Sequence, residues 1–236
     1  MKLEYDLVLR TCKSDMTSAN GFKWPKKGAV KAPDWAPTHE CGRGLHGLLR
    51  GCGDGNLLSN RPNAKWLVVK VLKGTCIDLG GKVKFPKGTV VYAGTKEEAV
   101  KIIAEAYPEA PVVFANRHSG DYGVSTSDYG GTSTSGNFGT SISGDYGKSI
   151  SGDYGKSISD YHGASISGDG GTSISGIGGI STSGEGGTST SSIGGKLNIK
   201  LHDSYRYRTA VAYVGENGIE PNVAYKLDDD GNFIKA

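Results

Sequence analysis

The densest group of chemically capable side chains lies between residues 39 and 52. It contains His39, Cys41, Arg43, His46 and Cys52. Histidine and cysteine are the ligands that zinc prefers, but this spacing fits no closed zinc template, so packing and capping within a loop is the simpler interpretation. A cysteine near a histidine also suits nucleophilic catalysis, yet closeness in sequence does not establish that geometry. We assign no catalytic residue, no metal and no cofactor from this pattern.

The same region is rich in glycine. The stretches "GRGLHG" and "GCGDG" could bring backbone N–H groups close to a phosphate, although neither is a Walker or dinucleotide-binding fingerprint. A small nucleotide-like ligand is therefore the ligand we would expect here. Its candidate binding residues are Trp35, His39, Cys41, Arg43 and His46.

These residues belong to a predicted α+β domain that spans residues 1–116. Strands are indicated by "YDLVLR", "KWLVVKVL" and "GTVVYAG". One helix is well signalled, because Thr95 and Glu98 have the spacing of a capping box and Pro108 lies just beyond the expected end. The apolar face of this helix is formed by Val100, Ile103 and Tyr107.

Residues 120–199 divide into ten octads without an insertion. The fourth position is Gly in all ten; in the first nine, the sixth and eighth are Ser and the seventh is Thr or Ile. A disordered linker has no register to keep, so a fixed short period indicates a solenoid. Each octad reads as a turn and a short strand. We expect a β-solenoid over 117–199 with 16 residues per coil, and a short β cap over 200–236.

The strand alternation leaves two choices for the inner face. The last octad places Leu197 and Ile199 in the serine phase, which favours an interior of serines and leaves Lys148 and Lys156 facing solvent. The alternative buries the isoleucines. With serine inside, an apolar stripe faces outward and predicts a homo-oligomer. The expected oligomer surface is Ile142, Ile150, Ile158, Ile166 and Ile174.

Aromatic residues recur at the second or third octad position. Stacking along a corner of the rod is the simpler interpretation, and an adhesive edge for a planar ligand or a second rod is the alternative. Calcium is not favoured, because its binding repeat has nine residues rather than eight. The aromatic set is Tyr122, Tyr129, Phe138, Tyr146, Tyr154 and Tyr161.

Two resemblances follow from these motifs. Octads such as "SGEGGTST" resemble the eight-residue repeats of bacterial ice-nucleation proteins, which implies a β-solenoid. The stretches "KWPKKGAVKAPDW", "HECGRGLHG" and "RYRTAVAYVGENGIEPNVAYKL" resemble an uncharacterised family common in bacteriophage and prophage genomes. That resemblance implies a phage origin and a shared architecture, and it brings no established activity.

Charge and cysteine usage limit the partners and the compartment. Residues 1–116 carry 18 Lys and Arg against 11 Asp and Glu, without a long basic run, so nucleic acid is not an expected partner. The sequence contains no apolar run of signal-peptide or membrane-spanning length and no Cys-x-x-Cys pair. We expect a cytoplasmic protein of the host cell, or a virion component, that is not secreted and not bound to a membrane.

The expected function is that of a non-enzymatic binding or assembly protein. The solenoid would serve as a rigid scaffold or oligomerisation surface, and the first domain could sequester a nucleotide-like ligand. Two alternatives stay open. One is a counter-defence enzyme that acts on a nucleotide-like substrate, and the other is an ice- or surface-binding solenoid.

Overall fold

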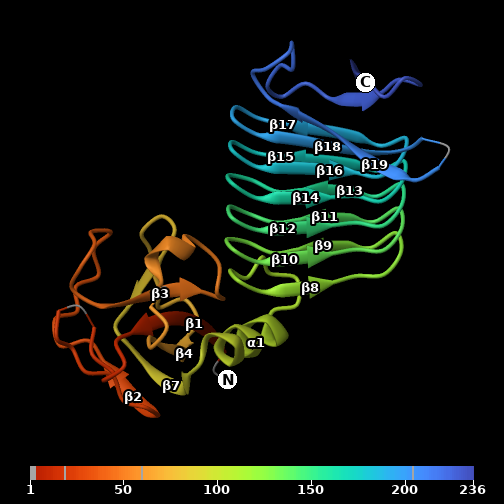
Figure 1. The fold of residues 1–236 in the computed structure, drawn as a ribbon. Coiled ribbons are helices and arrows are strands. Elements are labelled where there is room, and N and C mark those ends of the chain that lie inside the picture. The colour runs from red at the N-terminus through yellow and green to blue at the C-terminus, as the bar shows by residue number, and fades with distance from the viewer. Residues whose placement is uncertain (1–3, 19, 60, 204) are drawn as a thin grey trace. The chain divides into compact units, whose positions relative to one another are not determined.

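The chain divides into two compact units, residues 1–113 and residues 114–236, here named the front unit and the solenoid unit. The structure is a computed structural model and describes residues 4–18, 20–59, 61–203 and 205–236 (Figure 1). The front unit contains a seven-stranded sheet with the order β2-β7-β4-β1-β3-β6-β5. Its strands are β1 (Tyr5–Cys12), β2 (Gly28–Lys31), β3 (Leu45–Leu49), β4 (Lys65–Leu72), β5 (Ile77–Asp78), β6 (Val83–Phe85) and β7 (Lys87–Gly94).

The centre of this sheet is the antiparallel pair of β1 and β4, which runs from Tyr5 opposite Leu72 to Cys12 opposite Lys65. Successive residues of both strands are buried, so both faces of the sheet are covered. The helix α1 (Lys96–Ala106) packs against β1, β4 and β7. A 3-10 turn also occurs, at Gly55–Leu57.

The helix begins and ends where the sequence predicts. The Thr95 side chain accepts a hydrogen bond from the Glu98 backbone N–H, and Val100 and Ile103 are buried. The helix ends at Ala106, and the next residue turns its phenol back toward the sheet. There the Tyr107 hydroxyl accepts the Leu7 N–H at 2.8 Å, so the helix end is tied to β1.

The solenoid unit winds through two parallel sheets that alternate along the chain, and Figure 1 draws the coils as a stack of rungs. The β12 sheet contains β8 (Asn116–His118), β10 (Thr132–Thr134), β12 (Lys148–Ile150), β14 (Ala164–Ile166), β16 (Ile180–Ser183) and β18 (Lys196–His202). The β13 sheet contains β9 (Val124–Thr126), β11 (Thr140–Ile142), β13 (Lys156–Ile158), β15 (Thr172–Ser175) and β17 (Thr188–Ser191).

Each strand pairs with the strand two octads further on. Ser133 lies opposite Ser149 in the β12 sheet, and Ser141 lies opposite Ser157 in the β13 sheet, so equivalent residues stack at intervals of 16. The predicted fold class is confirmed: a β-solenoid with 16-residue coils follows a β-rich front region with little helix.

The third and fourth positions of each octad form the corner between two strands. The third position has a left-handed φ in all ten octads, between 50° and 68°, although half of these residues are not glycine. At the fourth position, a Cβ on any of the ten glycines would come within 2.8 Å of a neighbouring atom. The invariant fourth glycine is therefore required by close backbone approach rather than by its own φ.

The interior of the coils is lined by serine. The serines at the sixth and eighth positions are at most 5% exposed. The Ser149 hydroxyl, for example, donates to the Ile158 carbonyl at 2.5 Å and lies 2.9 Å from the Ser143 hydroxyl. Lys148 is exposed. The prediction that serine faces inward is confirmed, and the repeat isoleucines are half-buried on the outer faces.

The last coil is followed by antiparallel strands. Strand β19 (Tyr207–Tyr213) pairs with β18 along its whole length. Strand β20 (Tyr225–Leu227) pairs with β17 and with β21 (Phe233–Lys235). Leu197, Ile219 and Tyr225 form a small apolar core in this region. These strands cover the hydrogen-bonding edges that a bare solenoid end would expose.

One corner of the rod carries a ladder of stacked rings. Tyr122, Phe138 and Tyr154 stack with centroid distances of 5.0 and 5.2 Å and interplanar angles of 5° and 10°. A left-handed φ costs a non-glycine residue about 1–2 kcal/mol, and an aromatic pair contributes about 0.5–1.5 kcal/mol. The stacking thus offsets the backbone strain of these corners.

This balance leads to a prediction for Phe138. Its replacement by Ala removes two stacking contacts and keeps the strain, so we expect a loss of about 1–2 kcal/mol. Its replacement by Gly also relieves the strain, as at Gly170 in the same corner, and is expected to leave stability within about 0.5 kcal/mol of the wild type. Thermal unfolding followed by circular dichroism measures both. A Gly variant less stable than the Ala variant would contradict the explanation.

Candidate functional site

A buried lysine that no sequence motif indicated lies beside Trp35, one of the predicted ligand-binding residues. Lys84 on β6 is fully buried. Its Nζ donates to the Thr38 hydroxyl at 3.1 Å and to the Glu40 carbonyl at 2.8 Å, and it lies 5.9 Å from the Trp35 ring centroid. The two hydrogen bonds from Lys84 therefore hold the loop before β3 in place, and Trp35 lies beside the Lys84 ammonium group.

Three of the predicted residues are exposed on this loop. His39 Nδ1 lies 3.2 Å from the Asp78 carbonyl. The Cys41 thiol lies 3.1 Å from Lys82 Nζ, and this hydrogen bond lowers the pKa of the thiol. Arg43 has a left-handed φ of 49°, and its carbonyl accepts the Ala36 N–H. These residues hold the loop in shape and do not converge on one point.

The fifth residue, His46, lies on β3 and is half-buried. Its Nε2 accepts the Gly42 N–H at 3.3 Å. Burial, followed by the charges of Lys82, Arg10 and Lys84, lowers the pKa of His46. The imidazole is therefore neutral near pH 7. Within the described part of the chain, no three His, Cys, Asp or Glu side chains are arranged to hold a metal ion.

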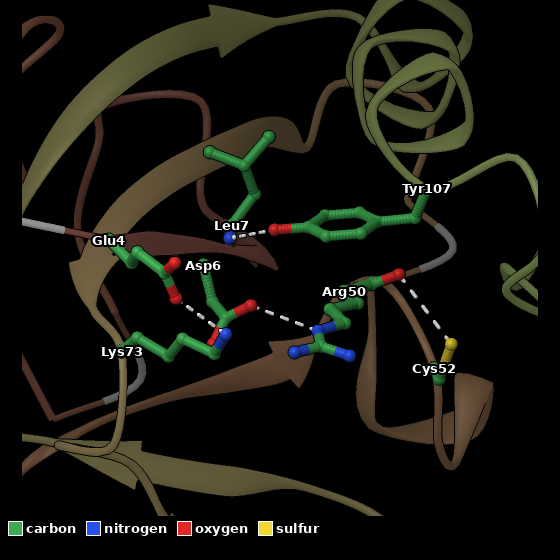
Figure 2. A network of polar contacts seen from close by, with 7 residues as sticks. All are labelled: Glu4, Asp6, Leu7, Arg50, Cys52, Lys73 and Tyr107. Carbon is green, nitrogen blue, oxygen red and sulfur yellow. Dashed lines mark hydrogen bonds and ion pairs between the residues drawn. The ribbon is translucent and has the colours of Figure 1, made fainter.

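Cys52, which the sequence places near this cluster, belongs to a different polar network (Figure 2). Its thiol lies 3.6 Å from the Arg50 carbonyl. The Arg50 Nε in turn forms an ion pair with the buried carboxylate of Asp6 at 2.9 Å, and its guanidinium lies over the Tyr107 ring. Glu4 and Lys73 pair beside it at 2.7 Å. This network joins strand ends to the helix end, and its contacts are those of a structural clamp.

The most regular surface of the chain is the outer face of the β13 sheet. Its ten outward positions on β9, β11, β13, β15 and β17 hold β-branched side chains at every place except Lys156. These residues are Val124, Thr126, Thr140, Ile142, Ile158, Thr172, Ile174, Thr188 and Thr190. Because β-branched side chains are stiff at χ1, the face presents fixed methyl and hydroxyl groups in two straight rows.

The outer face of the β12 sheet is less uniform. Its rows on β10 to β18 include two lysines, an alanine and an asparagine. Ile150 and Ile166 stack in register there, but Lys148 and Ala164 stand beside them. The two faces of one rod therefore differ in chemistry although their backbones repeat in the same way.

The architecture defines a class of protein, a β-rich domain followed by a β-solenoid of octapeptide repeats. Residues 7–102 match the family described as a domain of unknown function, DUF7666. This match covers most of the front unit and ends before the solenoid. No solved structure matches the chain, and no helix of the described residues is long and apolar enough to cross a membrane.

The chain is also similar to curated ice nucleation proteins. One from Pseudomonas fluorescens is 42% identical over 107 residues, which cover 44% of this chain and 9% of that protein. InaU from Pantoea ananas is 32% identical over 142 residues, or 54% of this chain and 14% of the relative. One from Xanthomonas campestris pv. translucens is 37% identical over 110 residues, 46% of this chain and 7% of the relative. These findings support the repeat resemblance, and the chain spans only about a tenth of these relatives.

Proposed function

We propose that the chain is a surface-binding protein that acts through the outer face of the β13 sheet, and that the surface it binds is ice. The observation that carries this proposal is the in-register stacking of threonine and isoleucine along that face. Neighbouring rungs of a sheet lie about 4.8 Å apart, and alternate residues of a strand about 6.8 Å apart. The outward side chains thus form a flat lattice that ordered water could match.

The side chains suit this role. Threonine offers a hydroxyl that hydrogen-bonds to water and a methyl that excludes disordered water, and isoleucine keeps the methyl. Both lose little rotamer freedom on contact, since they are already restricted. The names of the relatives support ice as the surface. With five coils the face is small, so we expect binding to ice crystals that already exist, rather than efficient nucleation of new ones.

Paired double variants test the proposal. Replacing Thr140 and Thr172 by Lys produces three successive lysines around Lys156 on the β13 face, and we expect ice binding to be lost. The matched control replaces Thr132 and Ala164 by Lys, which produces the same run around Lys148 on the β12 face, and we expect binding to be kept. Partition of the protein into a slowly growing ice crystal is the measurement. A wild type excluded from ice, or an equal loss in both variants, would disprove the proposal.

A second candidate function is self-association through the same face. Ile142, Ile158 and Ile174 form an unbroken half-exposed row in the β13 sheet, and closed two-fold contacts are common between like subunits. Light scattering on the proteins above, and on a variant with all three residues changed to Thr, decides between the two candidates. A dimer that forms with increasing concentration in the wild type, and that is lost in the Thr variant, favours self-association. The face buried in such a dimer is not available to bind ice. A monomeric wild type overturns self-association.

A further inference from the structure

On the front unit lies a group of cations that have no carboxylate partner among the described residues. Arg10 on β1 lines three adjoining hollows of about 560, 240 and 130 Å³. The smallest is also lined by Thr11, His46 and Lys82, and no acidic side chain lines it.

The contacts of Arg10 are all with neutral groups. Its Nη1 donates to the His46 carbonyl at 2.9 Å, its Nε donates to the Thr11 carbonyl at 3.2 Å, and its guanidinium lies 4.3 Å from the Trp24 ring centroid. Burial lowers the pKa of Arg10 to about 10. Burial of a cation without a counter-ion has an unfavourable desolvation free energy. Binding of an anion beside Arg10 would offset this penalty.

Two further cations lie close by. Lys82 lines the same hollow as Arg10, and Lys84 lies directly opposite His46 in the pairing of β3 with β6. Among the described residues, none of the three takes part in an ion pair with Asp or Glu. The neutral His46 stands among these charges and does not offset them.

A hydroxyl completes the set of donors. The Thr11 Oγ1 accepts the Ser59 N–H at 2.8 Å, which leaves the hydroxyl proton free to be donated. Guanidinium, ammonium and hydroxyl donors around a small hollow match the oxygens of a tetrahedral oxyanion. The adjoining hollow of about 560 Å³ extends past Arg61 and Asp15 and offers room for the remainder of a larger ligand.

We propose that the hollow lined by Arg10, Thr11 and Lys82, here named the Arg10 site, binds a phosphoryl group. The group could come from inorganic phosphate or from a nucleoside monophosphate. Of the residues that the sequence suggested for a nucleotide-like ligand, only His46 lines this site. The main donors come instead from β1 and from the residue before β6.

Cys41 provides a local reporter of occupancy. Its thiol lies 3.1 Å from Lys82 Nζ, which holds the pKa of the thiol below its usual value. An anion bound to Lys82 weakens this effect and raises the pKa, so less thiolate is present at pH 7. We therefore expect phosphate to slow the alkylation of Cys41 by iodoacetamide, as measured peptide by peptide with mass spectrometry.

Calorimetry on the full chain measures the binding itself, with inorganic phosphate and adenosine monophosphate as the probes. We expect Lys82→Gln to weaken binding about tenfold, the loss of one charge-assisted hydrogen bond, and Arg10→Met to weaken it at least as much. Lys87→Gln on β7 is the matched control and should bind as the wild type does. Because Arg10 packs on Trp24 and its variant could fail to fold, Lys82→Gln is the deciding variant.

The outcomes separate clearly. Tighter binding of the nucleotide assigns the site to nucleotides, and equal binding assigns it to free phosphate; both support the proposal. Absence of binding by either probe at millimolar concentration overturns it. The proposal is also overturned if Lys82→Gln binds as tightly as the wild type, or if alkylation of Cys41 is unaffected by saturating phosphate.

Discussion

Replacing Ser157 by Leu is expected to destabilise the solenoid by about 4 kcal/mol. The Ser157 side chain is fully buried between the two sheets, where its hydroxyl donates to the Ile166 carbonyl at 2.5 Å and lies 2.9 Å from the Ser151 hydroxyl. A leucine overfills this narrow space, which costs about 1–3 kcal/mol. It also leaves the buried Ser151 hydroxyl without its partner and removes one of the two hydrogen bonds to the Ile166 carbonyl, which still accepts the Ser151 N–H. These losses add about 1–3 kcal/mol.

The control places the same side chain on the outside. Thr172→Leu changes an outward, half-buried position on the neighbouring coil and is expected to alter stability by less than about 0.5 kcal/mol. Since 1 kcal/mol shifts the Tm of a chain of this size by about 2–4 °C, the Ser157 variant should melt roughly 8–16 °C below the wild type. Equal melting temperatures for the two variants would refute a close-packed serine interior.

The second large effect is expected for Gly155→Ala, at the invariant fourth position. An added Cβ would lie 2.7 Å from the Ser151 Cβ and 2.9 Å from the Gly139 carbonyl oxygen, which belongs to the coil below. Neither neighbour can move without opening the stack, so we expect a loss of about 3 kcal/mol, at the upper end for overpacking.

Gly186→Ala provides the comparison. Gly186 lies at a third octad position with a φ of 67°, and an added Cβ would meet no atom within 4 Å. Only backbone strain is then introduced, at a cost of about 1–2 kcal/mol. Urea unfolding of both variants separates steric overlap from strain. A Gly186 variant that is the less stable of the two would show that φ, and not space, fixes the octad glycines.

The solenoid could be predicted from sequence because its evidence is repeated ten times. Each octad gives the same spacing of glycine and serine, so a single register satisfies all of them. The inner face followed from two residues, Leu197 and Ile199, whose apolar side chains occupy the serine phase and are buried. In the repeats, the position of a residue within its octad also determines whether its side chain is buried, so the local pattern predicts the burial.

The front unit offered no such repetition, and its sites could be predicted only in part. Trp35 and Cys41 were found through their chemistry, but their partners Lys84 and Lys82 lie more than 40 residues further along the chain. Arg10 donates a hydrogen bond to the His46 carbonyl because β3 pairs with β1. A short sequence pattern does not predict such a pairing between distant segments. Lys84 is buried together with its neighbours Val83 and Phe85, because the loop before β3 covers it and accepts its hydrogen bonds.

The serine interior also determines how the solenoid responds to cold. Apolar surface exposed on unfolding raises the heat capacity, and polar surface lowers it. The coils bury hydroxyls and backbone groups where an ordinary domain buries aliphatic side chains. The heat-capacity change per residue on unfolding is therefore small, and the free energy of unfolding varies little with temperature. Hydrophobic cores weaken on cooling, whereas a rod held by stacked hydrogen bonds keeps its stability near the freezing point of water.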